Sequence, residues 1–229
     1  MTAAIARFDR RPTIASAKEI AGSFSIKNSK MPGSTFAMTA RECQTGAKLA
    51  TVAGSVCSGC YALRIEKIRP NVAKGWLANY LRATTMIETN MDAWVRACVF
   101  QINKGFDKTN EPFHRWFDSG DLQSVAMLNA IVRVVELTPH IKHWLPTREA
   151  TIVRDWQRAG GVRPANLIIR ISSTMIGDTP RNAEHTSTVH RKGKQHYGNE
   201  CEAYTRGGTC GDCRACWDDT VKNVSYPKH

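Results

Sequence analysis

The pattern of apolar and polar residues changes twice along this chain. Before residue 61, turn-forming and small residues dominate without a sustained period, which predicts an irregular segment. From Tyr61 the apolar residues recur every three or four positions, as on one face of a helix, and Pro70 can open a second helix. A stronger helical pattern covers residues 86–105, and Cys98 lies on its apolar stripe as an expected core residue.

Residues 113–180 alternate between short strand-like and helix-like stretches. The expected strands lie in 113–121, 140–148 and 164–177, and the expected helices span 121–136 and 149–161. Short connections between them imply crossovers within a parallel sheet. We therefore predict an α/β fold with a βαβαβ core, as an open partial sheet or an incomplete barrel.

The chain is expected to form one domain of 229 residues. In this interpretation residues 1–60 are an irregular basic segment with cysteines, and residues 61–180 form the helical and α/β core. Residues 181–229 lose the alternation and form a cysteine-rich segment that packs on the core. Loop-rich, cysteine-containing segments therefore flank the core on both sides.

Polar residues follow each predicted strand, where parallel sheets gather functional groups. These residues are expected to line one rim of the sheet. An alternative is that Ser119 and Asp121 only cap the next helix. The three sets are Asp118, Ser119, Gly120 and Asp121; Thr147, Arg148 and Glu149; and Ser172, Ser173 and Thr174.

Composition limits the class of protein. Hydrophobic residues make up 42% and charged residues 23% of the chain, which is ordinary globular usage and excludes collagen-like, coiled-coil and mostly disordered chains. No apolar run approaches the length of a membrane span, and residues 1–16 do not resemble a secretory signal. We expect a cytoplasmic protein with no membrane partner.

The net charge of +12 is concentrated in the first third, where residues 1–85 hold 13 basic and 4 acidic side chains. Concentrated basic charge is typical of proteins that bind DNA or RNA, although it also serves solubility alone. Arg10 and Arg11 are candidates for a basic arm. Trp76 and Tyr80 either stack on bases or pack in the core. The candidate phosphate contacts are Arg64, Lys67, Arg69, Lys74 and Arg82.

Four cysteines near the C-terminal end have the spacing of a metal site. Cys210, Cys213 and Cys216 form a Cys-x2-Cys-x2-Cys run, and Cys201 precedes it. Such a run resembles the ligand pattern of a [4Fe–4S] or [3Fe–4S] cluster, for which a more distant cysteine completes the set. Four thiolates also suit tetrahedral zinc, although zinc ligands usually come as two Cys-x2-Cys pairs.

A second group of cysteines precedes the helical region. Cys57 and Cys60 form a Cys-x2-Cys pair, which suits a redox pair, half of a zinc site or, with Cys43, three ligands of a second cluster. A site drawing on both ends of the chain is a further option. Disulfides are disfavoured because the cysteines cluster in a chain with no secretory signal. No catalytic triad order, phosphate loop or dinucleotide fingerprint is present, so the sequence favours a non-enzymatic protein.

Several of these motifs together resemble a known family. CQTG, CSGCYA, RWFDSGDLQS, WLPTRE and CGDCRACWDD, within residues 30–219, are similar to the phage gene-product-88-like family of small proteins. This resemblance implies a phage-encoded cytoplasmic protein with cysteine-bound iron–sulfur. The matching cysteines are Cys43, Cys57, Cys60, Cys201, Cys210, Cys213 and Cys216, and Ser119, Gly120 and Asp121 match the SGD element.

A more distant likeness is to radical S-adenosylmethionine enzymes, which place a cysteine motif before a parallel barrel. Their motif is Cys-x3-Cys-x2-Cys, whereas thirteen residues separate Cys43 from Cys57 here.

Three hypotheses follow. The first is an iron–sulfur protein that binds nucleic acid through its basic surface. The second is a radical-type or redox enzyme in which Asp118, Asp121, Arg148 and Glu149 face a cluster. The third is a zinc-stabilised interaction protein without catalysis.

Overall fold

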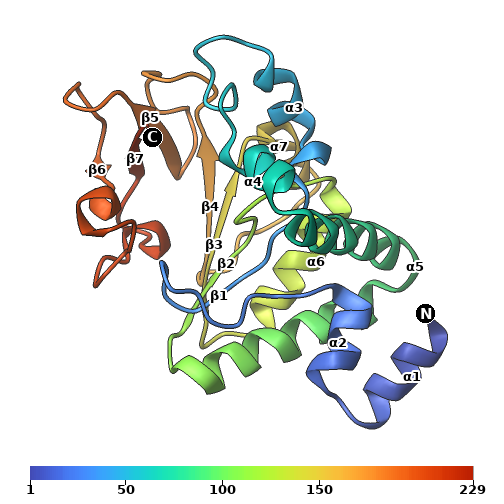
Figure 1. Cartoon of the computed structure of the whole chain (residues 1–229). Helices are drawn as coiled ribbons and strands as arrows, with labels where there is room; N and C mark the ends of the chain where they lie inside the picture. Colours follow the sequence, from blue (N-terminus) through green and yellow to red (C-terminus); the bar gives the residue numbers. More distant parts are fainter. Residues whose placement is uncertain (229) are drawn as a thin grey trace.

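A curled sheet of seven strands, paired in parallel throughout, forms the centre of the computed structural model, which describes residues 1–228 (Figure 1). The order across the sheet is β1-β2-β3-β4-β5-β7-β6. The strands are β1 (Ser34–Thr35), β2 (Phe113–Arg115), β3 (Lys142–Thr147), β4 (Leu167–Ser172), β5 (Thr186–His190), β6 (Asn199–Glu200) and β7 (Asn223–Pro227).

Seven α-helices accompany the sheet within residues 1–228, and the long α5 runs beside α6 (Figure 1). They are α1 (Thr2–Arg10), α2 (Ile14–Ala21), α3 (Gln44–Ala50), α4 (Tyr61–Ile68), α5 (Pro70–Thr109), α6 (Val125–Glu136) and α7 (Ala150–Arg158). None of the helices in this part of the chain is both long and apolar enough to cross a membrane.

The predicted α/β class is confirmed, and β2, α6, β3, α7 and β4 follow one another as the βαβαβ core. Alternate residues of the strands point to opposite faces. On one face Leu145 and Ile169 join the hydrophobic core that α2, α5 and α6 contribute to. On the other face Trp144 packs edge-on against Trp217 of the C-terminal segment.

The prediction that residues 1–60 are irregular is wrong over three short helices. Thr13 and Ser16 form a reciprocal capping box that starts α2. The buried residues of α1 and α2 are spaced by three or four positions, and they include Phe8 and Ile20. The helical period of the apolar residues is not evident in the sequence, because turn-forming residues interrupt these short elements.

Two helices that the sequence predicts as separate form one element, α5. Pro70 opens α5 as expected, and the helix continues to Thr109 with a kink at Asn90, whose φ is −161°. The sequence predicts a first helix up to Thr85 and a second over residues 86–105, so the predicted boundary lies before the kink. Cys98 is fully buried in the core, which confirms that prediction.

The sequence predicts no strands in residues 181–229. This prediction is also wrong, because β5, β6 and β7 complete the sheet. Most of the buried positions of β5 and β7 are polar rather than apolar. Thr186 donates to Asn223 Oδ1 at 2.8 Å, and Thr188 donates to Ser225 Oγ at 3.1 Å. Because these buried polar groups satisfy one another, the strands carry no hydrophobic alternation for a sequence to show.

Candidate metal centre

The four C-terminal cysteines lie around one small cavity. Cys201 follows β6, Cys210 and Cys213 lie in the next loop, and Cys216 belongs to the 3₁₀ helix η3 (Ala215–Trp217). Figure 1 shows this segment in orange and red beside the sheet. We call this arrangement the four-cysteine site. The other residues around the cavity are Asn199, Arg206, Ala215, Trp217 and Val224.

A buried arginine fixes the four-cysteine site to the sheet. The guanidinium of Arg170, in β4, donates to the carbonyl oxygens of Ala215 at 2.8 Å, Cys216 at 3.2 Å and Asp218 at 3.2 Å. The indole of Trp217 donates to the carbonyl of His114 at 2.9 Å. The cysteine loop is therefore held by side chains from the sheet and from η3 itself.

Burial favours the protonated form of three thiols of this site, those of Cys201, Cys210 and Cys216. It raises the pKa of Cys216 to about 12, although the Tyr226 hydroxyl at 3.3 Å and Arg170 both act to lower it. Burial also raises the pKa of Cys201 and Cys210. Thiolates are the form that binds metal, so ligation here would release protons.

The other three cysteines gather beside the strand ends, and we call them the three-cysteine site. Cys43 precedes α3, Cys60 precedes α4, and Cys57 lies in the loop between those helices. A Cβ atom added to Gly46 would lie 3.7 Å from the sulfurs of both Cys43 and Cys57. Burial raises the pKa of Cys43 above its usual range, and the charges of Asp121, Cys60 and Cys57 add to the rise.

Hydrogen bonds tie this second site to the predicted rim. Glu149, after β3, accepts from the backbone nitrogen of Thr45 at 2.8 Å and from its hydroxyl at 2.7 Å. The backbone nitrogen of Val56 donates to the carbonyl of Thr174, after β4, at 2.9 Å. The loops that carry the three cysteines therefore lie over the carboxyl ends of two central strands.

Asp121 joins two of the predicted rim groups. Its carboxylate accepts from the Thr147 hydroxyl at 2.5 Å and from the backbone nitrogen of Arg148 at 2.9 Å. Burial raises the pKa of Asp121 to about 6, against these hydrogen bonds. The alternative that Ser119 and Asp121 cap α6 is wrong, because Ser124 accepts the capping bond from Met127 at 3.1 Å.

Three buried polar atoms on the rim have no hydrogen-bond partner among residues 1–228. They are the Ser119 hydroxyl, the Arg148 Nε and the Ser173 hydroxyl. Each comes from a different one of the three polar groups that follow the strands. A buried polar atom without a partner is costly, so this rim is suited to a polar ligand that would satisfy it.

The structure does not bring the two cysteine sites together into the mixed site that the sequence allowed. The cysteines that act electrostatically on Cys43 are Cys57 and Cys60. Those that act on Cys210 are Cys201 and Cys213.

The predicted phosphate contacts fall on α4 and the first turns of α5. Arg64, Lys67, Arg69 and Lys74 are exposed, and none of them forms an ion pair with a described residue. Arg82 differs from them because it is half-buried and donates to the carbonyl of Glu19 at 3.2 Å.

The remaining candidates for nucleic-acid contact lie at the end of a helix or are partly buried. Arg10 is the last residue of α1, so it belongs to a helix rather than to an extended arm, and Arg11 follows it. Tyr80 packs against the core, and Trp76 is half-buried.

Comparison with known proteins identifies the family. A family model described as gene product 88 matches residues 7–219. The chain belongs to the gene product 88 family, a family of phage proteins. No curated protein and no solved structure matches it. The gene product 88 match gives no support to the likeness to radical S-adenosylmethionine enzymes.

Proposed function

We propose that this gene product 88 protein carries an iron–sulfur cluster at the four-cysteine site. The supporting observation is that Cys201, Cys210, Cys213 and Cys216 line one cavity. Arg170 and Arg115 act electrostatically on Cys216 and favour its thiolate form. These two cations would offset the negative charge of a thiolate-bound cluster, which when bound supplies one-electron transfer.

The spacing of the sulfurs favours a cluster over a single zinc ion. A tetrahedral zinc site with Zn–S bonds of about 2.3 Å places its sulfurs about 3.8 Å apart. Among residues 1–228, the groups of three or more possible ligand atoms within 4.8 Å of one another contain no cysteine. A cluster binds each thiolate through a different iron and therefore needs a wider arrangement.

The three-cysteine site is proposed to hold a second cluster. Three protein thiolates leave one iron of a four-iron cluster without a protein ligand. Burial and the neighbouring Asp121 raise the pKa of Cys43, whereas Arg148 acts to lower it, so Arg148 is the positive group that would favour its thiolate.

Metal and sulfide analysis of protein purified without oxygen tests both clusters. We expect iron and acid-labile sulfide, and we expect Cys213→Ser and Cys57→Ser each to lose the iron of one cluster. Cys98→Ala is the matched control, because Cys98 is buried in the core away from both sites, and it should keep all of the iron. Wild-type protein without iron and sulfide would refute the proposal.

We also propose that the exposed basic face of α4 and α5 binds nucleic acid. The observation in its favour is that Arg64, Lys67, Arg69 and Lys74 are exposed and have no carboxylate partner among the described residues. Cations that are not neutralised within the protein remain free to replace counterions on phosphates.

The salt dependence of binding to DNA and RNA oligonucleotides tests this surface. Each lost phosphate contact lowers the slope of log K against log salt by about 1. We therefore expect Lys67→Ala with Lys74→Ala to lower the slope by about 2, whereas Arg154→Ala, at an exposed position of α7, should not change it. Equal slopes for wild type and double variant would exclude this face as the binding surface.

A second candidate function, a redox enzyme at the rim, is favoured by one observation. The unpartnered atoms of Ser119, Arg148 and Ser173 lie on the same rim to which the three-cysteine site is tied. These atoms would hydrogen-bond a polar substrate close to a cluster with an open iron.

Electron paramagnetic resonance of the reduced protein tests this candidate, with cyanide as the probe of an open iron. We expect cyanide to shift the signal of wild type and of Cys213→Ser, and to leave Cys57→Ser unchanged. A wild-type signal that does not respond to cyanide would remove this candidate and leave the first proposal standing.

A further inference from the structure

Two groups of histidine and carboxylate ligands lie outside the cysteine sites, and a cation already occupies one of them. In the group of Glu184, His185 and Asp219, the guanidinium of Arg163 lies 2.6 Å from Glu184 and 2.9 Å from Asp219. The Nε2 atom of His185 is hydrogen-bonded to the carbonyl of Asp219 at 2.9 Å. This group is a protein-internal ion pair network and needs no metal.

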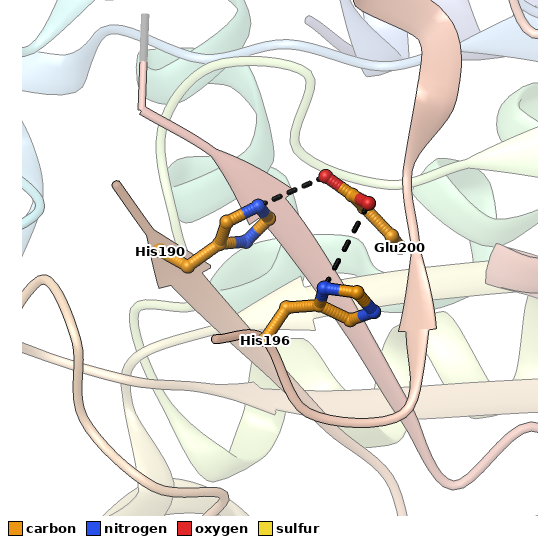
Figure 2. Close-up of side chains that lie close together, drawn as sticks. All are labelled: His190, His196 and Glu200. Atoms are coloured by element: carbon orange, nitrogen blue, oxygen red, sulfur yellow. Dashed lines mark hydrogen bonds and ion pairs between the residues drawn. The ribbon is translucent and has the colours of Figure 1, made fainter. Parts of the chain in front are cut away.

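The second group has no such cation. His190 ends β5, Glu200 ends β6, and His196 lies in the loop between these strands. Each of the three offers one ligand atom, and these atoms all lie within 4.8 Å of one another. Figure 2 shows both imidazole rings directed at the carboxylate, with His190 Nε2 at 3.0 Å and His196 Nδ1 at 3.7 Å from its oxygens.

Hydrogen bonds from behind fix the ring of His190. Its Nδ1 atom lies 2.8 Å from the Ser225 hydroxyl, which also accepts from Thr188 at 3.1 Å. Asn223 in turn donates to the Thr188 hydroxyl at 3.0 Å. Ligating histidines usually bond their second ring nitrogen in this way, which orients the ring and leaves the other nitrogen free to bind the metal.

Charge and access also suit a metal ion. The ion pairs of Glu200 among the described residues are with His190 and His196 alone. His190 is buried, whereas the side chain of His196 is 40% exposed, so an ion can reach the group from solvent. Two neutral imidazoles and one carboxylate leave a divalent ion with net positive charge and room for water.

We propose that His190, His196 and Glu200 bind a divalent transition-metal ion of the Zn²⁺ type. The ligands are His190 Nε2, one ring nitrogen of His196 and the Glu200 carboxylate, with water completing the coordination. Two histidines and one carboxylate with an open position also form known catalytic zinc and non-haem iron sites. In the metal-bound form the neutral ring of His190 carries its proton on Nδ1, which faces the Ser225 hydroxyl, and Nε2 binds the metal.

Titration with Co²⁺ tests this site separately from the cysteine sites. Cobalt bound to thiolates gives strong sulfur-to-metal charge-transfer absorption, whereas cobalt bound to imidazole and carboxylate gives only weak visible bands. We expect oxygen-protected, full-length protein to bind one Co²⁺ without a charge-transfer band. Zn²⁺ should displace this ion.

Two variants identify the ligands. His196→Ala removes an exposed side chain, and Glu200→Gln keeps the shape of the carboxylate while removing its charge. Each should weaken Co²⁺ binding at least tenfold, because even second-shell changes cost about 10- to 100-fold. His140→Ala is the matched control, since His140 is exposed and distant in sequence from the site, and it should bind Co²⁺ as wild type does.

The outcomes separate this proposal from that of the clusters. If Co²⁺ binds only with a sulfur charge-transfer band, or binds equally to wild type, His196→Ala and Glu200→Gln, the histidine site is refuted. Absence of iron would refute the clusters; the vacant cysteines would then add a sulfur charge-transfer band, and the histidine site would be identified by the Co²⁺ that His196→Ala and Glu200→Gln fail to bind.

Discussion

Replacing Arg170 with methionine is the sharpest test of how the cysteine segment is held. The side chain is fully buried in β4, and burial lowers the pKa of its guanidinium. No carboxylate pairs with it among the described residues, and its partners are backbone carbonyl groups. These belong to Ala215, Cys216 and Asp218 of the cysteine segment, and to Thr186 and Lys222. Methionine keeps much of the length and apolar stem while removing every donor.

The expected loss of stability can be worked from these contacts. A hydrogen bond from a charged donor is worth about 1.5–3 kcal/mol, but such values do not add when one group makes several bonds. Methionine also removes the cost of burying the charge, which offsets part of the loss. We therefore expect Arg170→Met to lower the free energy of unfolding by about 3 kcal/mol, the upper value for a single hydrogen bond from a charged donor.

Urea unfolding measures the loss, and limited proteolysis locates it. With a urea slope of about 2–3 kcal/mol/M, the midpoint should fall by about 1 M. Trypsin should cut the Arg170→Met variant faster at Arg206 and Arg214, because the segment is released from the sheet. Arg154→Met, which changes an exposed arginine on α7, should stay within about 0.5 kcal/mol of wild type. If the two variants unfold alike and are cut alike, Arg170 does not anchor the segment.

Two further perturbations test the rim and the sheet edge. Because burial raises the pKa of Asp121 from 3.8 to about 6, its favourable contribution is complete below pH 3.8 and is lost as the pH rises through 6. Urea melts should show that wild type, relative to Asp121→Asn, loses about 3 kcal/mol of unfolding free energy between pH 3.5 and 7.5. A difference in unfolding free energy between the two proteins that stays constant with pH would contradict this. Gly33 has a φ of +71°, and an added Cβ would lie 1.8 Å from the carbonyl oxygen of Phe113. Gly33→Ala should therefore lower the free energy of unfolding by about 3 kcal/mol in thermal or urea melts. In the control Gly59→Ala, the added Cβ meets nothing within 4 Å, and the loss should be less than about 1 kcal/mol. Equal losses in the two variants would refute the crowding argument.

The sequence predicts those parts of the fold in which apolar residues carry the pattern. The stripe of α6 includes Leu128 and Ile131, which are buried, and β4 contributes the apolar run around Ile169. The edge strands lack this signal. In β5 and β7 most of the buried side chains are threonine, serine and asparagine, whose hydrogen bonds across strands exist only once the sheet has formed.

The candidate sites were predictable to different degrees. Cys210, Cys213 and Cys216 are close in sequence, so their spacing alone indicates a common site. Cys43 has no such local signal, since its position beside Cys57 depends on how the loops between β1 and α4 fold over the strand ends. His190, His196 and Glu200 have no diagnostic spacing in the sequence, because they come from two strands and the loop between them.

The position of β7 has a consequence for synthesis. This strand pairs with β5 on one side and β6 on the other, although it follows both in the chain. While a ribosome is still translating residues 223–227, β5 and β6 have no partner between them, and the loop with Cys201 to Cys216 is tethered at one end. A nonsense codon shortly before Asn223 would thus delete the middle of the sheet's edge, and would expose a hydrogen-bonding ladder that other chains can occupy.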